Sequence, residues 1–351
     1  MSKKVIIIIL VVVFGVGAFV VGPTFLVFLA GRSTTVNTKA SDFYFDASLG
    51  LEGLATKLYN DGLIKDKEDL IKVGKYKDLD ATKLASGKYI IEPSTNFRTL
   101  LNGFTKNSAG NGNAEVEVDV TFNNCRDVYQ LAGKVSKLLL IDSAALVNAI
   151  TNKGLYEQLD LNDETISSLF LPNTYKMFYD TEPSTFVANM VRQYNAFWNA
   201  DRMAKLKKVG FDHPSEASTL ASIVYSEQSV NGQEWPIIAG LYLNRLHDGM
   251  KLQSDPTFKF CWGDQLKGVQ RLTYEHRDID CEYNTYKHSG LPPGPICIPP
   301  FEVIDAVLSP DKNDYLYMCA KPDYTGRHDF EASYSDHKRN ADIFQAWIAK
   351  Q

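Results

Sequence analysis

Hydrophobic and polar positions divide the chain into an apolar N-terminal run and a longer part with helix and strand periodicity. From Val5 to Ala30 the only polar side chain is that of Thr24. At about 1.5 Å per residue, a helix over this run exceeds the roughly 30 Å hydrocarbon core of a bilayer. A secretory leader has an apolar region of only about 7–15 residues. The run therefore predicts an uncleaved transmembrane helix at 5–30, with residues 1–4 in the cytoplasm and the bulk of the chain outside it.

The next part of the chain has the pattern of a small α+β subdomain, which we place at residues 43–110. Residues 31–42 before it are polar and predict a linker, and the Gly-, Asn- and Ser-rich stretch 106–114 predicts its boundary. Asp66 is a plausible N-cap for one of its helices. The predicted elements are helices at 49–63, 66–75 and 96–101 and a strand at 88–91.

The remaining residues, 115–351, predict a larger mixed α+β domain. Strict alternation in EVEVDVTF, residues 115–122, predicts a strand. From Arg271 onward Tyr, Pro and Gly are frequent, and we expect little helix before the last one. Helical periodicity predicts helices at 125–140, 144–151, 185–200 and 341–349.

The most informative stretch is 219–255, which predicts a helix, a loop, a second helix, a tight Asp248-Gly249 turn and an extended segment. On the first helix Leu220, Ile223 and Val224 form one apolar stripe, and the next position on that stripe is Glu227. Burial disfavours the charged form, so the pKa of this carboxyl should lie above its ordinary value of about 4.3. Such a group can donate a proton near neutral pH. The alternative is a glutamate near a helix end that points to solvent.

Composition and missing motifs exclude several classes of function. With 44% hydrophobic and 23% charged residues the chain is ordinary globular material, and its net charge of −5 gives no indication of nucleic-acid binding. No GxSxG, HExxH, Walker A or dinucleotide GxGxxG motif occurs. The six histidines are scattered without partners that spacing identifies, so we predict neither a metal site nor a cofactor.

Five cysteines are present, and four of them lie toward the C-terminus. No CxxC pair occurs, which argues against zinc. In an oxidising compartment we expect at least one disulfide among Cys261, Cys281, Cys297 and Cys319, with Cys125 left over. The pairing stays open, although Cys261 and Cys281 bracket a stretch whose closure would restrict the unfolded chain. Free buried thiols are the alternative.

Three polar, turn-rich segments follow the candidate acid. They read LQSDPT at 252–257, YNTY at 283–286 and SGLPPGPI at 289–296. In an extended segment Gln253 and Asp255 would alternate onto one face. Rigid loops with Tyr, Asn and Gln suit sugars, because rings stack on apolar sugar faces while amides pair with hydroxyls. The alternative is a Pro-rich surface turn beside a buried aromatic cluster.

Four segments in this order resemble the endolytic murein (lytic) transglycosylases, the YceG-like family. They are ASIVYSEQ at 221–228, LNRLHDGMKLQSDPT at 243–257, YNTYKHSGLPPGPI at 283–296 and GRHDFEASYSDHKRN at 326–340. The resemblance extends to the N-terminal anchor and to the small subdomain, which looks like the LysM-like subdomain of that family. It therefore implies a transmembrane helix, a LysM-like unit and a catalytic domain that carries its acid on a helix.

The resemblance also implies the site residues. Glu227 matches the catalytic glutamate, while Tyr225 stands where the family has a second acidic residue and Ser254 replaces the usual Thr. After Ile296 the chain departs from the family pattern, which leaves the distal edge of the sugar cleft uncertain. The implied substrate-binding residues are Asn244, Arg245, Gln253, Asp255, Thr257, Tyr283, Asn284, Thr285, Tyr286, Leu291 and Pro292.

The implied function is cleavage of peptidoglycan glycan strands at the cell (inner) membrane, from the periplasmic or extracytoplasmic side. Glu227 would protonate the oxygen between MurNAc and GlcNAc and then act as base, while the MurNAc 6-hydroxyl closes on C1 to leave a 1,6-anhydro end. Ordinary glycoside hydrolysis uses two carboxylates, so a muramidase using Glu227 and Asp255 is one alternative. The others are a non-catalytic peptidoglycan-binding protein and a scaffold for cell-wall synthesis proteins.

Overall fold

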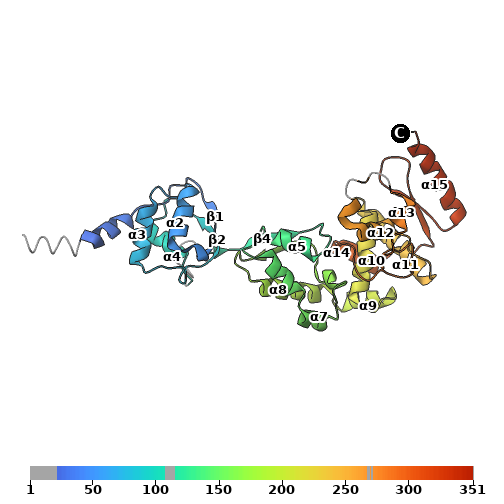
Figure 1. Ribbon diagram of the computed structural model, residues 1–351, viewed down its shortest axis with the longest axis horizontal. Helices are drawn as coiled ribbons and strands as arrows, with labels where there is room; N and C mark the ends of the chain where they lie inside the picture. The colour runs from blue at the N-terminus through green and yellow to red at the C-terminus, as the bar shows by residue number, and fades with distance from the viewer. Residues whose placement is uncertain (1–21, 107–114, 267–268, 270–271, 351) are drawn as a thin grey trace, which may run out of the picture. The chain divides into compact units, whose positions relative to one another are not determined.

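The computed structural model describes residues 22–106, 115–266, 269 and 272–350, and its fold is mixed α+β. These residues form two compact units (Figure 1). Unit 1 takes the chain up to Val120 together with Leu138–Leu140 and Tyr175–Thr181, and unit 2 takes the rest.

Most of the predicted N-terminal span lies outside the described residues, and only its last part, residues 22–30, is seen, as a helix. In the described part of the chain, no helix is both long and apolar enough to cross a membrane.

Unit 1 contains a three-stranded antiparallel sheet in the order β1-β2-β3, in which Phe43 of β1 lies opposite Tyr89 of β2. Both rings pack against Phe104, and all three are almost fully buried. Asp66 is an N-cap as predicted, because its carboxylate accepts from the Asp69 amide at 2.9 Å. The elements are β1 (Ser41–Phe45), α2 (Gly50–Asn60), α3 (Lys67–Tyr76), β2 (Gly87–Ile91), α4 (Phe97–Gly103) and β3 (Glu115–Val116).

The single strand predicted at 115–122 is two strands. Glu115–Val116 pairs with β2, whereas β4 (Val118–Phe122) pairs with β5 (Asn173–Met177) in a separate two-stranded sheet. The alternation continues through both strands, so the pattern alone does not reveal the change of partner at Glu117.

Unit 2 is mainly helical and also holds the hairpin β6-β7. The helices predicted at 144–151 and 185–200 agree with the structure within a few residues. The helix predicted at 125–140 is shorter at both ends in the structure, and the one predicted at 341–349 begins earlier, at Tyr334. The elements are α5 (Val128–Val135), α6 (Ser143–Ile150), α7 (Lys153–Leu159), α8 (Pro183–Phe197), α9 (Ala200–Lys208), α10 (Pro214–Glu227), α11 (Trp235–His247), α12 (Asp255–Trp262), α13 (Tyr274–Arg277), α14 (Phe301–Leu308), β6 (Tyr317–Ala320), β7 (His328–Glu331) and α15 (Tyr334–Ile348).

Helix α10 lies at the centre of unit 2, packed against α9, α11, α12 and α14. Most residues of α10 are themselves buried, including Ser215, Ser218, Thr219 and Ser222. Small side chains let neighbouring helices approach closely, and the Thr219 hydroxyl is satisfied locally because it donates to the Ser215 carbonyl at 2.7 Å. The apolar stripe of Leu220, Ile223 and Val224 is thus part of a helix that is buried nearly all round.

Two predictions for this region are wrong. The segment 252–257 is not extended, because Gln253 has a φ of 51° and Asp255 begins α12, with Pro256 in its first turn. Pro is well suited to that position, since the amide it lacks would have no helical partner. Helix α14 was not expected, although Pro300 directly precedes it and Val303, Ile304 and Val307 form its buried side.

Candidate active site

Glu227 is the last residue of α10, where the helix gives way to loop as the sequence predicts. The next residue, Gln228, has an extended backbone and is 4% exposed. Its side-chain oxygen accepts from the amides of Val230 and Asn231 at 3.2 and 3.0 Å. The loop that follows α10 is thereby folded around a buried amide, which fixes the end of the helix that carries Glu227.

Two hydroxyl groups hold the Glu227 carboxyl. Tyr242 of α11 donates to Oε1 at 2.9 Å, and Ser254 donates to the same oxygen. Among the described residues, none hydrogen-bonds to Oε2. With Oε1 accepting twice, Oε2 is the oxygen left to carry a proton.

The pKa of Glu227 is raised above its ordinary value. Burial is the main cause, the hydrogen bonds from Ser254 and Tyr242 oppose it, and the charge of Asp255 adds to it. Burial and the charge of Glu227 also raise the pKa of Tyr242 well above its usual range, so this phenol remains a donor. The structure thus agrees with a partly buried carboxyl at the wall of a cavity rather than one turned to bulk solvent.

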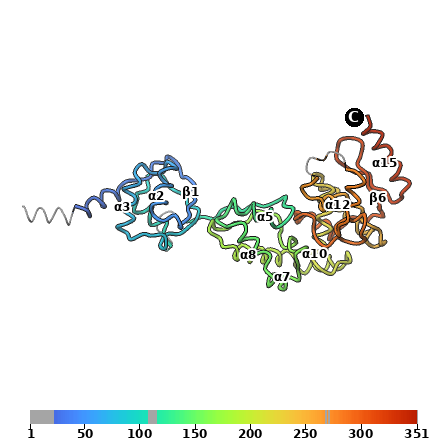
Figure 2. Tube along the Cα trace, viewed as in Figure 1, coloured from blue at the N-terminus to red at the C-terminus, as the bar shows by residue number. Residues whose placement is uncertain are grey.

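Glu227 lines a cavity of about 500 Å³ in unit 2, which is within the usual range for ligand sites. Residues from α10, α11, α12, β6, β7 and α15 meet around it, and Figure 2 traces these segments within that unit. Its lining is rich in tyrosine, histidine and charged side chains, which suits a polar, hydroxyl-bearing ligand.

Five of the predicted site residues line this cavity: Glu227, Arg245, Gln253, Asp255 and Tyr286. Arg245 is only 7% exposed, and it donates to the carbonyls of Leu316 and Leu252. Burial lowers its pKa, yet a guanidinium keeps its charge in proteins. It therefore adds a fixed positive charge to the wall of the cavity.

Asp255 and Gln253 both line the cavity, but they do not alternate along an extended strand as predicted. The Asp255 carboxylate accepts from Tyr286 Oη at 2.7 Å, and that bond links α12 to the YNTY segment. The left-handed backbone of Gln253 is unusual for a residue with a side chain, and strain of this kind often occurs at functional sites. Its side chain is exposed in the cavity wall.

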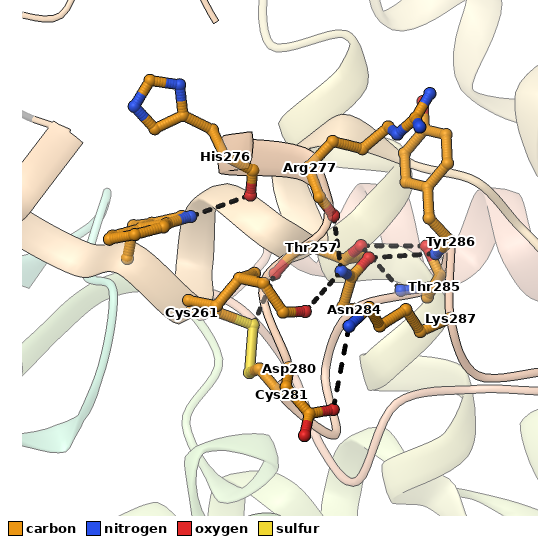
Figure 3. Close-up of a disulfide and its surroundings, with 12 residues drawn as sticks. Thr257, Cys261, His276, Arg277, Asp280, Cys281, Asn284, Thr285, Tyr286 and Lys287 are labelled. Atoms are coloured by element: carbon orange, nitrogen blue, oxygen red, sulfur yellow. Dashed lines mark hydrogen bonds and ion pairs between the residues drawn. A yellow bond between two sulfur atoms is a disulfide. The ribbon is translucent and has the colours of Figure 1, made fainter. Parts of the chain in front are cut away.

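Three predicted binding residues, Thr257, Asn284 and Thr285, instead hold the loops together. All are at most 1% exposed. The amide of Asn284 donates to the Arg277 and Ile279 carbonyls at 2.7 and 2.9 Å, and the hydroxyls of Thr257 and Thr285 bond to each other at 2.8 Å (Figure 3). Their contacts orient Tyr286 and Ser254, because Asn284 accepts from the Tyr286 amide and Thr285 from the Ser254 amide.

Four further predicted residues lie away from the cavity lining. Asn244 donates to the Asn313 and Tyr315 carbonyls, each at 3.0 Å. Tyr283 packs on Phe260, with ring centroids 4.7 Å apart. Leu291 and Pro292 belong to residues 289–296, which we call the Pro-rich loop.

A disulfide joins Cys261 to Cys281, as the bracketing of that stretch suggested, while Cys125, Cys297 and Cys319 are free. Figure 3 shows the bond beside Asn284, at the base of the YNTY segment. The disulfide links α12 covalently to the chain just before this segment, and both α12 and the segment contribute residues to the cavity lining.

Sequence reasoning missed Tyr242 and Ser254, which donate hydrogen bonds to Glu227, and it missed His328 in the wall of the cavity. His328 bonds to Glu234, which is 94 residues away in the chain, so no local spacing signals the pair. No group of three or more His, Cys, Asp or Glu residues in the described ranges is arranged to hold a metal ion.

Comparison with known proteins decides the family. The sequence profile of the YceG-like family matches residues 45–343. The chain belongs to the YceG-like family.

The relatives of this YceG-like chain carry a consistent name. An endolytic murein transglycosylase of Bacillus subtilis (strain 168) is 26% identical over 321 residues, which span 87% of this chain and 84% of the relative. An endolytic murein transglycosylase of Streptococcus pneumoniae serotype 2 (strain D39) is 24% identical, over 83% of this chain and 56% of the relative. A crystal structure of a yceG-like protein from Listeria monocytogenes has a TM-score of 0.55 and 22% identity, over 86% of this chain and 99% of that one.

Proposed function

We propose that this chain is a peptidoglycan lytic transglycosylase in which Glu227 is the general acid and base. Relatives named endolytic murein transglycosylase support the activity. The observation that carries the residue assignment is the Glu227 carboxyl itself. It lines the cavity with a raised pKa, and hydroxyls occupy Oε1 while no described residue pairs with Oε2.

One carboxyl is sufficient for the first chemical step. A protonated Glu227 gives its proton from Oε2 to the glycosidic oxygen between MurNAc and GlcNAc, and the C1–O bond breaks. Positive charge develops at C1 as Glu227 becomes a carboxylate, and the negative charge then stabilises that centre. The MurNAc 6-hydroxyl oxygen bonds to C1 and passes its proton to the Glu227 carboxylate, which gives a 1,6-anhydro end without consuming water.

Asp255 defines the alternative product. It lines the same cavity and is oriented by Tyr286, so a muramidase would use it as the second carboxylate. That reaction adds water and leaves a reducing MurNAc end. Mass spectrometry separates the two outcomes, because the anhydro product is lighter by one water.

The deciding test is Glu227→Gln assayed on purified glycan strands. Glutamine keeps the shape and still accepts from Tyr242 and Ser254, but it cannot give a proton. General acid–base catalysis contributes typically about 10²–10⁴-fold, and we expect a loss of at least that size with glycan binding retained. Glu302→Gln, an exposed carboxyl on α14, is the matched control and should cleave normally.

Two results would count against the proposal. Wild-type turnover by Glu227→Gln would remove the residue assignment. Glycan binding without any new strand ends in the wild-type protein would instead favour a binding protein or a scaffold for cell-wall synthesis proteins.

We further propose that residues 5–30 anchor the chain in the cell (inner) membrane, with both units on the extracytoplasmic side. The apolar run supports the anchor, and the Cys261–Cys281 bond supports an oxidising compartment. Unit 1 would then be a LysM-like module that adds contacts to the glycan strand.

A further inference from the structure

His328 and Glu234 form a pair at the wall of the cavity. His328 is the first residue of β7, and its Nδ1 lies 2.8 Å from Glu234 Oε2. The backbone amide of His328 donates to the other carboxylate oxygen at 3.1 Å. Glu234 is 6% exposed, so this carboxylate is buried against the histidine.

Glu234 is held in the charged form and in one orientation. Burial by itself would raise its pKa, but hydrogen bonds from His328 and Gln228 outweigh burial and place the pKa below its ordinary value. Gln228 donates to Glu234 at 3.0 Å and to the Gly326 carbonyl at 2.8 Å. The residue directly after Glu227 therefore also positions the carboxylate that holds His328.

This arrangement decides which ring nitrogen of His328 carries a hydrogen. A carboxylate only accepts hydrogen bonds, so Nδ1 must carry a hydrogen. The second nitrogen, Nε2, then has a lone pair in the neutral ring. None of the described residues hydrogen-bonds to Nε2, and His328 lines the cavity that Glu227 lines. A histidine held by a carboxylate at one ring nitrogen, with the other nitrogen able to accept a proton, has the usual arrangement of a general base.

We propose that His328 Nε2 is the base that receives the proton of the attacking sugar hydroxyl, so that acid and base are separate groups. This inference rests on the transglycosylase function proposed above and changes one assignment within it, because Glu227 then acts as the acid alone. Glu227 gives its proton to the leaving oxygen as the C1–O bond breaks. The 6-hydroxyl oxygen bonds to C1, and its proton passes to Nε2. Glu234 then faces an imidazolium, whose charge it stabilises, and the imidazolium returns the proton to Glu227 or to water after product leaves.

A merely structural role predicts something different. The Glu234–His328 contact also ties β7 to the loop before α11, and losing it would loosen the cavity wall without removing a base. Glutamine at position 328 retains a hydrogen-bonding group, whereas alanine leaves a space that free imidazole fits. Only a missing base is replaced by added imidazole.

The experiment uses the full-length chain and peptide-free glycan strands, with thermal melting to confirm that each variant is folded. We expect His328→Gln and His328→Ala to lose about 10²-fold in kcat with little change in KM. Imidazole should restore much of the kcat of His328→Ala and leave His328→Gln unchanged. His247→Gln, whose imidazole is exposed at the end of α11, is the matched control and should behave as wild type.

The outcomes separate cleanly. Loss of kcat that imidazole restores in His328→Ala supports the base. Wild-type kcat in both variants, or a loss in folded protein that imidazole leaves unchanged, overturns it. Failure of the function itself has another signature, because the wild-type protein would then yield no anhydro ends or Glu227→Gln would keep its turnover.

Discussion

At the scale of single residues, opposing effects set the acidity of Glu227. Burial favours its neutral form, while hydrogen bonds from Tyr242 and Ser254 favour the carboxylate. Burial wins, and the pKa is raised. The hydroxyls still matter for the chemistry, because they stabilise the carboxylate that exists once the proton has left.

A raised pKa makes the stability of the protein depend on pH in a definite direction. Between the unfolded pKa of about 4.3 and the higher folded pKa, the folded state binds more protons than the unfolded state. Stability therefore falls as pH rises through this window. Glutamine does not titrate, so the melting temperature of Glu227→Gln relative to wild type should rise as the pH increases from about 4.3 through the higher folded pKa of Glu227.

Thermal melts at several pH values check this prediction, with Glu302→Gln as the reference for losing one carboxyl. If the melting temperature of Glu227→Gln relative to wild type stays constant or falls as the pH rises, that result would contradict the raised pKa.

The sequence could identify Glu227 because its position on an apolar helical stripe is a local property. It could not identify Tyr242 or Ser254 as its partners, since α11 and α12 bring them to the carboxyl only in the folded chain. The same holds for His328, which one would take for a surface residue until Glu234 is placed beside it.

At the scale of elements, α10 carries the acid and also anchors the Pro-rich loop. The Ser222 hydroxyl, fully buried, accepts from the Ile296 amide at 2.9 Å and donates to the Thr219 carbonyl at 2.7 Å. The Ser222 side chain thus gives the Ile296 amide the acceptor that a neighbouring strand would otherwise provide. Sequence patterns place such a serine on a helix without showing what it binds.

The pair Ser222→Ala and Ser218→Ala tests this anchoring. Ser222→Ala leaves the buried Ile296 amide without an acceptor and should lower the free energy of unfolding by about 1–3 kcal/mol. Ser218 is equally buried, but its hydroxyl has no hydrogen-bond partner among the described residues. Ser218→Ala should therefore be neutral or stabilising in urea denaturation. Equal losses in both variants would show that the hydrogen bond to Ile296 contributes nothing.

The disulfide gives a second prediction for the elements that line the cavity. Cys261 and Cys281 close a loop with a sequence separation of 20, and cross-linking such a loop restricts the unfolded chain by about 3 kcal/mol. The Cys261→Ser, Cys281→Ser double variant should be less stable by about that amount. Thiol titration of the denatured, non-reduced protein should find the three remaining cysteines free. Five free thiols would exclude the bond.

Helix boundaries show where local pattern is sufficient and where it is not. α10 and α11 were predicted because apolar periodicity and the Asp248-Gly249 turn agree. α12 was missed because Gln253 takes a left-handed backbone, which Asn or Gly would have signalled and Gln does not. α14 was missed because the frequent Tyr, Pro and Gly after Arg271 indicated little helix, although proline is acceptable just before or at the start of a helix.

In the molecule as a whole, the two units are not separated at a single point in the sequence. Unit 1 includes Leu138–Leu140 and Tyr175–Thr181, which come after the boundary that composition suggests at 106–114. Gly- and Asn-rich composition marks a loop, but it does not show that later segments return to the earlier unit. An N-terminal fragment that ends within residues 106–114 would therefore lack the later segments of unit 1.

The structure indicates where the chain can be truncated to remove the proposed membrane anchor. Residues just after the apolar run belong to unit 1: the Thr35 amide donates to the Thr95 carbonyl at 2.9 Å, and the Phe97 amide donates to the Ser33 carbonyl at 2.9 Å. A chain that begins at Ser33 keeps these contacts and lacks the run. We expect it in the soluble fraction with its cleavage of glycan strands intact, whereas the full-length chain should resist a carbonate wash and need detergent. Recovery of the full-length chain as a soluble, shortened species would mean that the run is a cleaved leader.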